Sequence, residues 1–122
     1  MLQEELVTHE VAKLAKEKGF NEYVEAFYAE GCDTAHSQGP EKWNEYKGKY
    51  VAPTQSLLQR WLREEKAIAI VLQPYSYDIQ RSTYTWIYEI WADNNFEKTS
   101  KSFKTYELAL EDALKYTFKN LV

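Results

Sequence analysis

The stretch VAPTQSLLQRWLREE, residues 51–65, decides the fold because it predicts the helix against which the rest of the chain packs. Pro53 and Thr54 suit its start, since proline favours the first helical position and a threonine hydroxyl can accept from a free amide of the first turn. The apolar side chains recur on one side of a helix: Leu57, Leu58, Trp61 and Leu62. The remaining side chains are expected in solvent: Gln55, Gln59, Arg60, Arg63 and Glu64. Buried, the apolar set contributes roughly 1.5–3 kcal/mol per residue, so this helix is expected to contribute most to the core.

Length and composition indicate one globular domain, residues 1–122. The chain has ten Tyr, five Phe and four Trp, a share of aromatic residues typical of a β-rich core or a binding surface. A net charge of -4 argues against general capture of nucleic acid or of an anionic membrane. Cys32 is the only cysteine, which excludes an intramolecular disulfide and a four-cysteine zinc site. The acidic amino terminus and the lack of an apolar run of about 18 residues predict a cytoplasmic location.

Two elements are predicted before the central helix. A short helix is expected to begin after Thr8 and to end at Gly19, which is suited to a left-handed stop. Residues 21–31 fit either a helix or a strand, and their β-favouring side chains favour a strand over 24–29. Residues 31–48 lack a clear period and are expected to form a long surface loop, anchored by aromatic residues: Trp43, Tyr46 and Tyr50.

The carboxyl-terminal half predicts three strands and a helix. The run AIAIVLQ, residues 67–73, is expected to be a strand buried on both faces and ended by Pro74, with a polar turn over 74–82. Residues 84–92 alternate, and because burying Glu89 unpaired would cost several kcal/mol, the opposite face, with Trp86 and Tyr88, should meet the helices. Residues 96–103 can return as a polar edge strand. A final amphipathic helix should begin after Thr105, with Glu111 and Lys115 as an i, i+4 ion pair.

This order, α, then β, a loop and α-β-β-β-α, predicts an α+β domain of two layers. We expect an antiparallel sheet of three strands, or of four if residues 24–29 join it, with the helices packed mainly on one face. The segment from Pro53 onward has the element order of double-stranded RNA-binding domains. Such domains grip phosphates with a lysine-rich start of the last helix. Here Lys104 is the sole cation before three acidic residues, so RNA binding by that mode is not expected.

The segments YVAPTQSLLQRWLRE, residues 50–64, and FKTYELALEDALKY, residues 103–116, resemble a group of small uncharacterised proteins of bacterial genomes and of their phages or mobile elements. The likeness covers most of the chain from about Thr8 and is most specific at 52–65 and 106–114. The group has no established activity, so the resemblance implies no catalytic residues. It implies a cytoplasmic setting and an accessory role.

Few residues could carry catalysis or hold a metal. Cys32, Asp33 and His36 could start a metal site, completed by Glu30 or His9, but polar loop residues explain them better. A Cys32 nucleophile would need a lowered thiol pKa and an orienting third group. The adjacent carboxylates are expected on solvated helix faces: Glu4 and Glu5, Glu64 and Glu65, and Glu111 and Asp112. No common nucleotide-binding or hydrolase motif occurs, so we expect no enzyme, no cofactor and no metal.

Two surfaces could bind a partner. The sheet face away from the helices would carry an apolar group with one carboxylate: Val71, Ile87, Glu89 and Trp91. If nothing in the chain covers it, such a face marks a site for an unidentified protein or for a second copy in a homodimer. The alternative is a basic and aromatic patch that could grip single-stranded nucleic acid: Trp43, Tyr46, Lys49, Arg60 and Arg63. The first surface is the preferred hypothesis.

Overall fold

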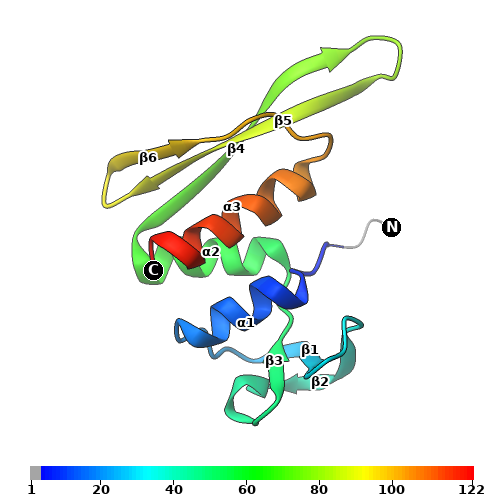
Figure 1. Cartoon of the computed structure of the whole chain (residues 1–122), viewed down its shortest axis with the longest axis vertical. Helices are drawn as coiled ribbons and strands as arrows, with labels where there is room; N and C mark the ends of the chain where they lie inside the picture. The colour runs from blue at the N-terminus through cyan, green and yellow to red at the C-terminus, as the bar shows by residue number, and fades with distance from the viewer. Residues whose placement is uncertain (1–3) are drawn as a thin grey trace.

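A computed structural model of the protein describes residues 4–122 and places three helices between two antiparallel three-stranded sheets (Figure 1). The elements in chain order are α1 (His9–Glu17), β1 (Val24–Ala29), β2 (His36–Glu41), the 3-10 helix η1 (Trp43–Glu45), β3 (Lys49–Val51), α2 (Gln55–Lys66), β4 (Ile68–Asp78), β5 (Thr83–Ala92), β6 (Asn95–Thr99) and α3 (Tyr106–Asn120). The α+β class is confirmed, and so is the order α-β-β-β-α from α2 onward. Buried side chains from both sheets and all three helices form one apolar cluster.

The central helix forms as the sequence predicts. The Thr54 hydroxyl caps α2 by accepting from the Leu57 amide at 3.2 Å, and Leu58 and Leu62 are fully buried. The prediction for Gln55 is wrong, because this side chain is only 4% exposed. It is buried where the start of α2 meets α3, and its Nε2 donates to the Glu107 carbonyl at 2.9 Å.

The larger sheet has the order β4-β5-β6, and the helices cover one of its faces (Figure 1). Tyr88 and Ile90 on that face are fully buried, which confirms the predicted orientation of β5. The prediction that the first strand is buried on both faces is wrong, because no layer formed by residues 4–122 covers the other face and Val71 is 40% exposed. Pro74 does not end the strand either. The register shifts there, and β4 continues to Asp78.

The smaller sheet has the order β2-β1-β3 and forms the third layer, which the two-layer prediction missed. The strand at β1 has the predicted bounds, but it pairs with β2 and β3 rather than joining the larger sheet. The expected loop over 31–48 is wrong, since it contains β2 and η1. The β2 sequence HSQGPE has few β-favouring residues, so its strand depends on backbone pairing with β1. Trp43 does anchor the segment, with its ring 4.5 Å from that of Phe27.

Helices α1 and α3 pack against each other. Thr8 caps α1, and Gly19, at φ 95°, ends it, as predicted. The expected pair between Glu111 and Lys115 is wrong, because Lys115 instead contacts Glu10 of α1 at 3.0 Å. Glu111 also turns to α1, where it accepts from the Thr8 amide at 3.0 Å and from the Thr8 hydroxyl at 2.7 Å. The Glu111 carboxylate of α3 therefore joins α3 to the start of α1.

Candidate functional site

The face of the larger sheet that points away from the helices is called here the outer face. Antiparallel pairing places Trp91 opposite Ala69 and Phe96, and Glu89 opposite Val71 and Thr99. Alternate residues of a strand share a face, so Ile87 lies on the same side, and so does Gln73, which it pairs with. The centre of the outer face thus includes eight side chains from paired positions: Ala69, Val71, Gln73, Ile87, Glu89, Trp91, Phe96 and Thr99.

Large apolar side chains lie open to solvent on this outer face. Val71 is 40% exposed, Trp91 37% and Phe96 51%, while Ile87 and Glu89 are half-buried. The Trp91 and Phe96 rings meet edge to face, with centroids 5.4 Å apart. The structure therefore brings together the four residues predicted for this surface and adds Phe96. The turn at 93–94 could have identified Phe96, because a tight hairpin there pairs Phe96 with Trp91.

Glu89 is the one charged residue among the eight side chains of the outer face. Within residues 4–122 its carboxylate forms no ion pair and accepts no hydrogen bond. The lysines after β5 do not reach it: the Lys98 ammonium lies 4.8 Å from the Tyr116 ring centroid, on the helical side, and that of Lys101 lies 5.7 Å from the Phe103 ring centroid. The outer face therefore combines apolar surface with one carboxylate that the described residues leave unpaired.

The β4 edge of the larger sheet is protected, in contrast to the outer face. The Ala67 carbonyl accepts from the Asp93 amide at 3.1 Å, so the register turns the backbone groups of Ile70, Leu72 and Pro74 away from β5. Gln59 of α2 donates its Nε2 to the Ile70 carbonyl at 2.8 Å. Pro74 has no amide to donate, and the bulge there bends the strand. Addition of a further strand along β4 is therefore disfavoured, and the outer face is the more accessible surface.

The alternative basic and aromatic patch is only partly assembled. Lys49 lies against three rings, with its ammonium 4.9 Å from the Phe27 and Trp43 centroids and 5.2 Å from the Tyr46 centroid. Trp43 is 8% exposed, so its ring has little free surface on which a base could stack. This group lies at the end of the molecule away from the larger sheet (Figure 1).

The two arginines of that patch lie on α2, which packs against the larger sheet. Arg60 donates its Nε to Glu64 at 2.7 Å, and this hydrogen bond raises the pKa of the guanidinium while offsetting its charge. Arg63 is exposed and lines a shallow hollow with Glu4 and Arg60, in which Trp43, Tyr46 and Lys49 take no part. The structure therefore separates the five residues into two groups.

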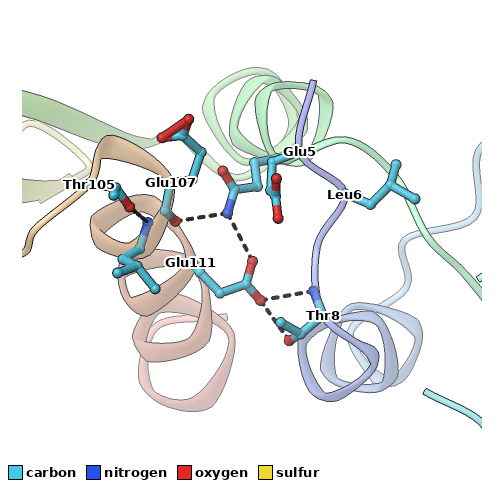
Figure 2. A pocket seen from close by; sticks show the side chains of 8 residues that line it. Glu5, Leu6, Thr8, Thr105, Glu107 and Glu111 are labelled. Atoms are coloured by element: carbon cyan, nitrogen blue, oxygen red, sulfur yellow. Dashed lines mark hydrogen bonds between the residues drawn. The ribbon is translucent and has the colours of Figure 1, made fainter. Parts of the chain in front are cut away.

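A hollow of about 350 Å³ lies where α1, α2 and α3 begin (Figure 2). Three carboxylates line it: Glu5, Glu107 and Glu111. The Glu111 carboxylate has a structural role, since one oxygen accepts a hydrogen bond from Gln55 at 3.0 Å and the other accepts two from Thr8. The expectation of a solvated carboxylate is thus wrong for Glu111, which is half-buried, whereas Asp112 is exposed as predicted and also accepts from the Tyr88 hydroxyl at 2.7 Å. The contacts of this hollow join helices and give no acid/base pair.

The residues around Cys32 approach one another without forming a complete site. Its sulfur lies 3.9 Å from His36 Nε2, and His9 Nδ1 lies 3.5 Å from an Asp33 oxygen. Among residues 4–122 no three His, Cys, Asp or Glu side chains are placed to hold a metal ion. The Asp33 carboxylate is fully exposed and pairs with His9 rather than with His36, so it does not act as the third group that would orient His36 toward the thiol.

Comparison with protein families, curated proteins and solved structures gives no match for this chain. None of the helices in residues 4–122 is long and apolar enough to cross a membrane. The functional argument therefore depends on the geometry and chemistry of the surfaces described above.

Proposed function

We propose that this protein is a small accessory protein that binds another protein through the outer face of its larger sheet. The observation that carries the proposal is the adjacent exposure of Val71, Trp91 and Phe96 on a sheet face that no other layer of the described chain covers. Exposed apolar groups of this kind mark interaction sites, and tryptophan is enriched among the residues that dominate binding energy. In this proposal the protein acts in the cytoplasm by binding, with no catalytic step.

The exposed area on the outer face suits a modest but specific interaction. A large apolar side chain gains roughly 1.5–3 kcal/mol on full burial, and these three are each about half exposed, so covering them supplies about 2–4 kcal/mol. Stable complexes need more than this to offset lost translational freedom. The partner is therefore expected to extend beyond the apolar centre, over the neighbouring polar residues of β5 and β6.

Binding of single-stranded nucleic acid is the second candidate, and the structure favours it less. Its support is the exposed ring of Tyr46 beside Lys49 and the exposed Arg63. Against it, Trp43 is buried, Arg60 is paired with Glu64, and the net charge is -4. Phosphate-driven binding would also weaken steeply as salt rises, which binding to an apolar face would not.

A pull-down from a lysate of the source organism, with and without nuclease, tests the proposal. Trp91→Gln removes the aromatic centre of the outer face, and Leu108→Gln is the matched control because Leu108 is exposed on α3, on the other side of the sheet. We expect a protein that survives nuclease, is retained by Leu108→Gln and is lost with Trp91→Gln. Recovery of nucleic acid that is insensitive to Trp91→Gln and lost when Arg63 is neutralised would contradict it.

A further inference from the structure

We infer that the partner of the outer face presents a lysine or arginine side chain, surrounded by apolar groups, to the carboxylate of Glu89. This inference rests on the proposed function and specifies the chemistry of the partner. The observation behind it is the position of Glu89 among apolar side chains, without an ion pair in the described part of the chain.

Apolar side chains lie on three sides of Glu89, and Thr99 of β6 lies on the fourth. Ile87 and Trp91 flank it along β5, and Val71 lies directly opposite on β4. A partner that covers Val71 and Trp91 must therefore also cover the carboxylate between them. Removing an ionised carboxylate from water without a compensating donor costs several kcal/mol, which would cancel the gain from the apolar contacts. A cationic donor at this position gives a charge-assisted hydrogen bond and offsets that cost.

The same reasoning disfavours a second copy of this chain as the occupant. A dimer formed by packing two outer faces about a two-fold axis would bring both Glu89 carboxylates into one apolar interface. The lysines nearest in sequence cannot neutralise them in place, because Lys98 lies over Tyr116 on the helical side. The net charge of -4 adds to this repulsion. Charge complementarity therefore selects a different protein with a basic side chain at its contact surface.

The probe for this inference is a random peptide library displayed on phage and selected against wild-type protein, Trp91→Gln, Glu89→Gln and Glu89→Lys. We expect the peptides that require Trp91 to carry a lysine or arginine between apolar residues. Glu89→Gln should weaken their binding by about 10- to 100-fold, the effect of losing one charge-assisted partner. Glu89→Lys should instead select peptides with aspartate or glutamate at the corresponding position. Circular dichroism of each variant checks that the fold is retained.

The outcomes separate the inference from the proposed function. Peptides that require Trp91 but carry no basic residue, and that bind Glu89→Gln as well as wild type, would overturn the inference and leave the proposed function standing. Absence of any peptide that requires Trp91 would overturn both. Sedimentation of the wild-type protein that shows a dimer, lost in Trp91→Gln, would replace the basic partner by a second copy.

Discussion

The contact between Glu111 and the start of α1 gives the most specific stability prediction. Its carboxylate accepts three hydrogen bonds, from the Thr8 amide at 3.0 Å, the Thr8 hydroxyl at 2.7 Å and Gln55 Nε2 at 3.0 Å. A hydrogen bond contributes about 1 kcal/mol net when water can replace the lost partner, so Glu111→Ala should lower the free energy of unfolding by about 2–3 kcal/mol. For a domain of this size that corresponds to a fall in Tm of about 10 °C.

Urea unfolding followed by circular dichroism measures this change, and Glu107→Ala is the matched control. Only the backbone carbonyl of Glu107 contacts Gln55, and its carboxylate points away from Glu111 (Figure 2). The control should cost about 0.5 kcal/mol, the size of a helix-dipole interaction in the first turn. Equal losses in the two variants would refute the conclusion that the Glu111 carboxylate joins α1, α2 and α3.

Three further predictions concern other contacts of the core and the helix seam. Tyr88→Phe removes the bond to Asp112 and should cost about 1 kcal/mol at neutral pH. Burial and Asp112 raise the pKa of Tyr88, so the folded state holds this proton more tightly than the unfolded state and wild-type stability should fall as pH rises through the alkaline range. Urea unfolding at several alkaline pH values should show a smaller loss of unfolding free energy for Tyr88→Phe than for wild type. An equal loss with pH in the two proteins would contradict the prediction. The hydrogen bond with Lys115 lowers the pKa of Glu10, so its stabilisation is present above the ordinary glutamate pKa and is lost on acidification. The stability difference between wild type and Glu10→Gln should therefore shrink toward acidic pH, and a difference that grows would contradict it. Leu62→Ala empties a fully buried site and should cost about 2–5 kcal/mol by urea unfolding, and a loss under 1 kcal/mol would show that the central helix contributes little to the core.

Local patterns in the sequence predicted most of the helices and the orientation of the main strands. Each threonine cap is followed by an apolar stripe, and both signals come from residues close in the chain, as at Thr54 and Leu58. The alternation around Glu89 also predicts which face of β5 meets the helices. Burying an unpaired carboxylate costs several kcal/mol, so the face without Glu89 must be the buried one. These features were predictable since they depend on period and polarity alone.

Long-range pairing could not be predicted in the same way. The strand β2 has a polar sequence with Gly39 and Pro40, and it is a strand only because β1 supplies its backbone partners. The sequence around Glu111 predicts an ordinary surface residue, because its partner Thr8 is far away in the chain and comes beside it only in the folded protein. The sequence predicts that Pro74 ends the strand, but its missing amide falls at the β4 edge of the sheet, where the strand tolerates it.

The sequence predicts the central residues of the candidate site but misses one residue at its margin. Val71, Ile87, Glu89 and Trp91 follow from alternation in two strands, whereas Phe96 required the register of the hairpin that follows Trp91. The sequence does not determine whether the outer face is exposed, because the amino-terminal part of the chain could cover it. In the structure that part forms α1 and the smaller sheet, on the side of α2 and α3 that faces away from the larger sheet (Figure 1).

The most direct test of the central claim is the map of amide chemical shifts in isotope-labelled protein when the partner, or a selected peptide that requires Trp91, is added. The account predicts that the largest changes fall on β4, β5 and β6 around Val71, Glu89 and Trp91, with little change at Tyr46 or Arg63. Changes concentrated at Tyr46 or Arg63, with the outer face unaffected, would contradict it.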